Sequence, residues 1–184
     1  FYPNIFKEKK IFMQEGWHYE LDKPDGELKI NGVVYNEMKG AFSSPDDVLD
    51  RAVLNTLFPD NTYAFESGGD PDDIPALTYE EYLQFHKKYY HPSNSYLYLY
   101  GNMDMEERLN WLDAHYLADF DYQEVDSEIN EQKPFAKPVD IVQEYSITTD
   151  ESERDHTYLS YNAVVGNVLD KEKYIAFQIL DYAL

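Results

Sequence analysis

Glu37 is the residue of this chain whose type and position are most suggestive of chemistry. It lies in the stretch Gly32-Val-Val-Tyr-Asn-Glu-Met-Lys-Gly-Ala-Phe42, whose apolar residues recur with the period of a helix and would surround the carboxylate. An ionised carboxylate is rarely buried without a partner, because its desolvation is costly. Three explanations are open: an ion pair in the core, a surface helix whose apolar face is misassigned, or a metal-binding or catalytic carboxylate. The local pattern alone favours the two structural explanations.

The histidines do not complete a catalytic or metal-binding motif. His86 and His91 are five residues apart, about 140° around a helix, so they cannot bind one metal ion from one helical face. His91 precedes Pro92 at the end of a predicted helix, where we expect it to act as a cap. The other three histidines are isolated in sequence: His18, His115 and His156. The chain has no H-E-x-x-H, H-x-x-E-H, G-x-S-x-G, P-loop or G-x-G-x-x-G motif, and so no complete catalytic set.

The composition excludes several classes of function. Asp and Glu number 36 against 15 Lys and Arg, a net charge of −21, which argues against binding to nucleic acid or to an anionic membrane surface. There is no cysteine, so disulfides and thiolate metal sites are excluded. The hydrophobic content of 43% is sufficient for a folded core. We therefore expect a folded protein whose charge would favour cationic partners, although a generally acidic surface is a better explanation than a dedicated means of attracting them.

Local signals predict a mixture of helices and strands. Ser44 and Pro45 are typical of a helix start, and Thr78-x-x-Glu81 has the form of a capping box. Residues 66–73 read as an acidic loop without the register of a calcium site, although a calcium-binding adaptor stays open as a weaker hypothesis. The predicted helices are 4–15, 32–42, 45–58, 79–90, 104–117 and one from 170; the predicted strands are 16–21, 95–100, 139–149 and 156–165.

One segment has the composition of a linker. Residues 119–138 are acidic and polar and are closed by Pro134 and Pro138. The chain begins at Phe1 rather than at Met and stops within a helical pattern, so we expect an internal fragment of a longer protein.

Several short stretches, in order and in register, resemble one family. They are Gln14-Glu-Gly-Trp-His18, the stretch around Glu37, Leu57-Phe-Pro-Asp60, Ser67-Gly-Gly-Asp-Pro71, Leu77-Thr78, Phe85-His-x-x-Tyr-Tyr-His-Pro-Ser-Asn94 and Tyr100-Gly-Asn102. Together they resemble the pitrilysin/insulinase family of zinc metallopeptidases, most closely its presequence-protease and falcilysin branch. The resemblance is strongest over residues 12–102.

The resemblance implies a zinc metalloendopeptidase that degrades peptides. Such enzymes bind Zn²⁺ through two histidines of an inverted H-x-x-E-H motif and a distal glutamate, which by position would be Glu37. The general base and both histidines are expected upstream of Phe1, so this fragment alone is expected to lack both zinc and activity, and no catalytic residue is assigned within it. The alternative is a non-catalytic binding or scaffold subunit with the same fold.

The resemblance also implies an α+β fold, a processing-peptidase-like α/β roll. Residues 1–125 would form the C-terminal part of the catalytic-type domain, 126–138 an acidic linker, and 139–184 the start of a second, non-catalytic domain. The expected partners are peptide substrates, cationic peptides among them, and the remainder of the polypeptide. Neither nucleic acid nor a membrane is an expected partner. We expect a cytoplasmic location of the bacterial type.

Overall fold

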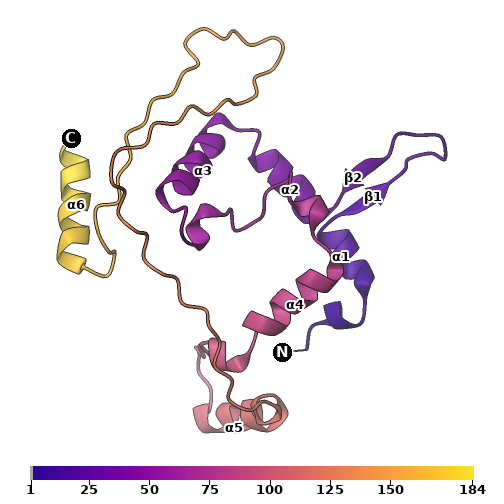
Figure 1. Cartoon of the computed structure of the whole chain (residues 1–184). Helices are drawn as coiled ribbons and strands as arrows, with labels where there is room; N and C mark the ends of the chain where they lie inside the picture. Colours follow the sequence, from indigo (N-terminus) through magenta and orange to yellow (C-terminus); the bar gives the residue numbers. More distant parts are fainter. Residues whose placement is uncertain (1) are drawn as a thin grey trace.

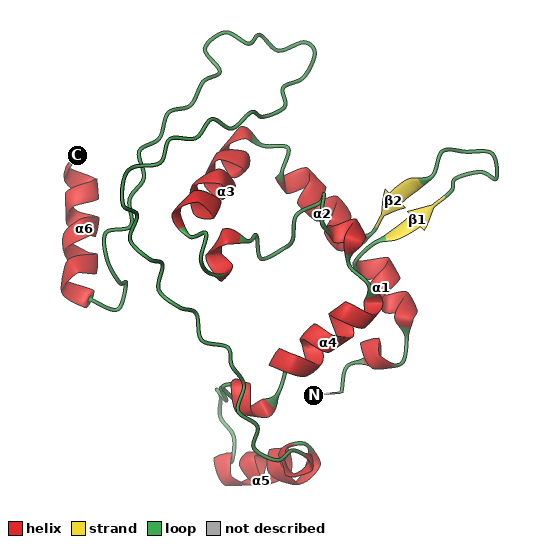
Figure 2. Cartoon of the chain, in the orientation of Figure 1, coloured by secondary structure: helices red, strands yellow, loops and turns green. Residues whose placement is uncertain are grey.

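The computed structural model describes residues 2–184, and helices dominate it (Figure 1, Figure 2). The α-helices are α1 Lys9–Glu15, α2 Val33–Ala41, α3 Pro45–Leu57, α4 Tyr79–Tyr89, α5 Met105–His115 and α6 Lys171–Ala183. Short 3-10 helices are η1 Asn4–Phe6, η2 Thr62–Ala64, η3 Ile74–Ala76, η4 Pro92–Asn94 and η5 Leu117–Asp119. The predicted helix over 4–15 is therefore divided into η1 and α1.

The sheet seen in the described residues is one antiparallel hairpin. Strand β1, His18–Glu20, pairs with β2, Lys29–Asn31, in a register that sets His18 opposite Asn31 and Glu20 opposite Lys29. Between the strands, the amide of Gly26 donates to the carbonyl of Lys23 at 2.9 Å and closes a turn at residues 23–26. The strand predicted within residues 16–21 is thus confirmed.

Side-chain caps start three helices where the sequence predicts them. Thr78 and Glu81 form the complete capping box of α4, while Asp104 and Asp170 accept backbone amide hydrogen bonds at the starts of α5 and α6. Ser44 occupies the N-cap position of α3 with Pro45 next to it, but its hydroxyl makes no capping hydrogen bond.

Three predicted strands are not formed. Residues 95–100, 139–149 and 156–165 carry strand-favouring side chains, yet none of them belongs to a strand in the structure of residues 2–184. The expectation that 95–100 is buried is also wrong, because Tyr96, Tyr98 and Tyr100 are highly exposed. A strand needs a hydrogen-bonding neighbour, and the described chain provides none for these segments. The larger sheet expected of an α/β roll is therefore not formed within residues 2–184, whose sheet is the two-stranded hairpin.

The core is small. Ile5, Ala52 and Ile74 are the buried apolar residues of the described chain. Figure 1 shows the hairpin and α1–α4 in one part of the molecule, with α5 and α6 at separate ends and long extended segments between them. Among residues 2–184, no helix combines the length and apolar character needed to cross a lipid bilayer. The contacts that position α2, the helix of Glu37, lie in the part of the molecule formed by the hairpin and α1–α4.

Candidate functional site

Hydrogen bonds centred on Asn31 anchor the N-terminal end of α2. The Asn31 Oδ1 atom accepts from the Gly32 amide at 2.8 Å and from the Asn36 side chain at 2.6 Å. Its Nδ2 donates to the Glu20 carboxylate at 2.7 Å. Because Asn36 directly precedes Glu37 and Glu20 lies on β1, this network joins the helix that carries Glu37 to the hairpin.

A close backbone contact places α2 against the segment before β1. Gly32 has φ +155°, and a Cβ atom there would lie 2.1 Å from the carbonyl oxygen of Gly16. The Tyr35 amide donates to this same oxygen at 3.3 Å. Trp17, next in the chain, donates its indole N–H to the carbonyl of Leu77 at 2.9 Å. Two of the stretches that carry the family resemblance thus meet at the start of α2, and a third, Leu77-Thr78, is joined to them through Trp17.

The acidic loop of residues 66–73, which contains Gly68 and Gly69, also contacts α2. A Cβ atom at Gly68 would lie 2.3 Å from the sulfur of Met38, so glycine allows the loop to approach the helix closely. Two residues further on, Asp70 forms an ion pair with Arg51 of α3. The Arg51 guanidinium also lies 4.3 Å from the ring centroid of Phe42, a cation–π contact.

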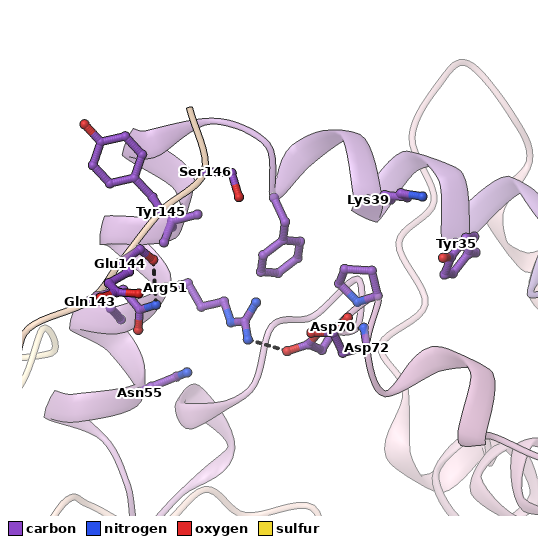
Figure 3. Close-up of a pocket in the computed structure, with 14 residues that line it drawn as sticks. Tyr35, Lys39, Arg51, Asn55, Asp70, Asp72, Gln143, Glu144, Tyr145 and Ser146 are labelled. Atoms are coloured by element: carbon purple, nitrogen blue, oxygen red, sulfur yellow. Dashed lines mark hydrogen bonds and ion pairs between the residues drawn. The ribbon is translucent and has the colours of Figure 1, made fainter. Parts of the chain in front are cut away.

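These contacts surround a pocket of about 400 Å³ between α2, α3, the loop and residues 143–146 (Figure 3). Figure 3 shows Arg51 directed toward Asp70 across the pocket. Cationic and carboxylate side chains both line it, so it has no single sign of charge. The sequence analysis missed the pair of Arg51 and Asp70, and no local signal joins residues 19 positions apart.

Glu37 itself is exposed. The half-buried residues of α2 are Val34, Tyr35 and Met38, whereas Val33 and Glu37 face solvent. The expectation that Glu37 lies within a packed apolar face is therefore wrong, and the explanation of a misassigned surface helix fits the geometry. Within residues 2–184 the Glu37 carboxylate makes no hydrogen bond or ion pair, which also excludes a core ion pair within this part of the chain.

The residues that the structure describes do not form a metal site by themselves. Nowhere in the described chain do three His, Cys, Asp or Glu side chains gather so that they could hold a metal ion. The side chain of Asp70 in the acidic loop is instead engaged by Arg51 and by the Asp72 amide at 2.8 Å. The geometry gives the calcium hypothesis no support, and a zinc site that includes Glu37 needs ligands from outside the described residues.

The histidines have structural contacts. His91 accepts a hydrogen bond at Nδ1 from the Ser93 amide at 3.2 Å, so it caps the start of η4 and not the end of α4, where the sequence predicted a cap. His86 stacks on Tyr90 with ring centroids 4.5 Å apart and meets the edge of Phe6 at 5.0 Å. Burial among these rings lowers the pKa of His86.

The capping box next to Leu77 changes the pKa of its glutamate, Glu81. The Thr78 amide and hydroxyl both donate to the Glu81 carboxylate, at 2.9 and 2.8 Å. These hydrogen bonds, the amide first, lower the pKa of Glu81 below its usual range because they favour the ionised form. The box fixes the start of α4 beside the carbonyl that receives the Trp17 hydrogen bond.

Comparisons with known proteins identify the class of this chain. The sequence profile described as "Peptidase M16 inactive domain" matches residues 76–184. Protein HypA of Clostridium perfringens is 55% identical over the whole chain, which covers 19% of that relative. Presequence protease 1, chloroplastic/mitochondrial, of Arabidopsis thaliana is 41% identical over the whole chain, which covers 17% of it. The mitochondrial presequence protease of Drosophila melanogaster is 52% identical over 59% of the chain and 11% of its own length.

The chain therefore belongs to the peptidase M16 family, that is, the pitrilysin/insulinase family, and to its presequence-protease branch. It spans less than a fifth of the length of these curated relatives. The resemblance read from the short sequence stretches is confirmed at the level of the family.

Proposed function

We propose that this chain is part of a zinc-dependent metalloendopeptidase that degrades peptides, and that Glu37 is the distal zinc ligand. The observation that carries the proposal is the state of Glu37. Its carboxylate is exposed and without a partner in the described chain, on a helix held by Asn31 and by the Gly16–Gly32 contact. A ligand on an anchored helix can be positioned accurately before a metal binds.

The chemistry of zinc agrees with this assignment. Two imidazoles and one carboxylate leave a fourth coordination position for water, which zinc activates when it is bound. The two imidazoles and the general base would come from outside these 184 residues. This chain would contribute one ligand and the framework that orients it.

Peptides are the proposed substrates because the relatives are named presequence proteases. The net charge of −21 would favour cationic peptides by electrostatic complementarity. The α/β roll, the division into residues 1–125, 126–138 and 139–184, and a cytoplasmic location of the bacterial type are further parts of this proposal.

A second candidate is a non-catalytic binding or scaffold subunit of the same fold. It is favoured by the description of the matching profile as an inactive domain over residues 76–184. An H-x-x-E-H motif in the remainder of the protein would support the enzyme, and its absence would support the scaffold.

The proposal is tested with Glu37→Gln in the full-length protein that contains this chain. An amide is a poor zinc ligand, so we expect loss of most bound zinc and a fall of at least about a hundredfold in peptide cleavage, typical of losing a zinc ligand's charge and geometry. Glu27→Gln is the matched control, since Glu27 is an exposed glutamate in the hairpin loop. Full zinc content and activity in Glu37→Gln would refute the assignment, and a wild-type protein that binds no zinc would favour the scaffold.

A further inference from the structure

Residues 119–132, here called the strap, begin at the last residue of η5 and carry much of the acidic segment that has the composition of a linker. In the structure they are attached to the preceding part of the molecule at regular intervals. At the start of the strap, the Tyr2 hydroxyl donates to the Asp119 carboxylate at 2.7 Å, and the Tyr2 ring stacks on Phe120 at 5.9 Å. The ring of His91 also packs against Phe120, in a T-shaped arrangement with ring centroids 5.5 Å apart.

The middle of the strap is attached to η4. The Gln123 amide donates to the Ser93 hydroxyl at 3.1 Å, and the Ser127 hydroxyl donates to the Asn94 side chain at 2.8 Å. These two attachments are four residues apart along an extended chain, so this stretch follows η4 rather than leaving it.

The end of the strap is held by a reciprocal pair of hydrogen bonds, here called the clasp. The Asp60 amide donates to Gln132 Oε1 at 3.0 Å, and Gln132 Nε2 donates to the Asp60 carboxylate at 2.7 Å. The Asn61 side chain adds a bond to the carbonyl of Asn130 at 3.2 Å. One glutamine side chain thus satisfies both a backbone donor and a carboxylate directly after α3.

The clasp also marks the point where the chain turns along α3. Residues 132–145, residues 156–164 and apolar residues of α3 together line a groove of about 1290 Å³. Figure 1 shows the chain running from the region of α5 to α3 and then past this helix. The clasp therefore lies where this segment begins to line the groove.

We propose that residues 119–132 are a fixed strap and that the Gln132–Asp60 clasp sets the path of the following chain across α3. The strap is a conformational device: opening the clasp would release residues 130–138 from α3 and leave the attachments at η4 in place. This inference is independent of the zinc assignment, because no contact in the strap involves Glu37.

Limited digestion of the full-length protein with a glutamyl endopeptidase tests the strap. Glu124, Glu128 and Glu131 are cleavage points within it. Gln132→Ala removes both hydrogen bonds of the clasp, so we expect cleavage after Glu131 to become about three- to tenfold faster, the change that losing one or two such bonds gives to local opening. Cleavage after Glu124 should change much less, because Gln123 and Ser127 keep their attachments.

Two further variants make the test specific. Asn130→Ala is the control, because the bond at this position uses the backbone carbonyl, and cleavage should stay at the wild-type rate. Asp60→Ala leaves the Asp60 amide bond in place and should give an intermediate rate. An unchanged rate after Glu131 in Gln132→Ala, or an equal increase in Asn130→Ala, would overturn the proposal. Circular dichroism equal to wild type and faster hydrogen exchange at the Asp60 amide in Gln132→Ala would support it.

Discussion

Gly32 lies against Gly16 so closely that a Cβ atom at position 32 would be 2.1 Å from the Gly16 carbonyl oxygen. The same oxygen accepts the Tyr35 amide, so the contact fixes the first turn of α2 against the segment that leads into β1. Backbone atoms cannot move aside as a flexible side chain can. This contact, together with the Asn31 network, determines where Glu37 is presented.

Gly32→Ala should therefore be strongly destabilising. The backbone conformation alone costs a non-glycine residue about 1–3 kcal/mol, and the clash with Gly16 adds to this. Gly40→Ala in the same helix is the control, because nothing lies within 4 Å of a Cβ atom there. Alanine should stabilise that position by about 0.5–1 kcal/mol. Thermal unfolding of the two variants of the full-length protein should shift in opposite directions, and equal shifts would contradict the contact.

The Arg51–Asp70 pair should be important for stability as well. The two side chains are only 31% and 20% exposed, so Arg51→Leu leaves a partly desolvated carboxylate without its partner. We expect a loss of roughly 1–2 kcal/mol, reduced from the fully buried case by solvent screening. Arg108→Leu is the control, since its pair with Glu107 is mostly exposed and should be worth little.

A double-mutant cycle isolates this interaction. Asp70→Asn added to Arg51→Leu should cost less than the sum of the two single changes, because the charge that lost its partner is then removed. Strict additivity in chemical denaturation would show that the pair does not form.

His86 should make stability depend on pH. Burial lowers the pKa of His86 in the folded state, so below the ordinary histidine pKa of about 6.5 the unfolded state binds more protons. The folded state should therefore lose stability as the pH falls through this value toward the folded pKa. His86→Phe keeps the ring contacts with Phe6 and Tyr90 but cannot be protonated.

Melting temperatures between pH 7.5 and 5.5 measure this effect. The wild type should lose more stability than His86→Phe over this interval, and the difference cancels the contributions of the other histidines. If the melting temperatures of the two proteins changed with pH in parallel, protonation of His86 would not contribute to the pH dependence of stability.

The sequence was sufficient for features that short-range interactions determine. The Thr78–Glu81 box, Asp104 and Asp170 mark helix starts because each side chain reaches amides only three residues away. The segment at 95–100 has strand-forming residues, but a ladder also needs a neighbour that local pattern cannot supply. Other contacts join positions that are distant in sequence, and a local residue pattern cannot predict them. Examples are the Arg51–Asp70 ion pair and the clasp between Gln132 and Asp60.

For Glu37, too, the sequence predicted the local structure but not the contacts between distant residues. Its helix was predicted within one or two residues, but the side of α2 that is packed depends on Gly16, Gly68 and the loop, which are remote in sequence. The apolar residues on both sides of the helix made the periodicity ambiguous. The proposed role of Glu37 as a zinc ligand therefore rests on the family resemblance of the stretch around it, and not on the helical periodicity.

The most direct test of the zinc assignment is anomalous diffraction at the zinc absorption edge from crystals of the full-length protein that contains this chain. We predict an anomalous peak about 2.0–2.2 Å from a carboxylate oxygen of Glu37, the usual zinc–oxygen bond length. A fully occupied zinc ion bound by other residues, with the Glu37 carboxylate outside its coordination sphere, would contradict the assignment.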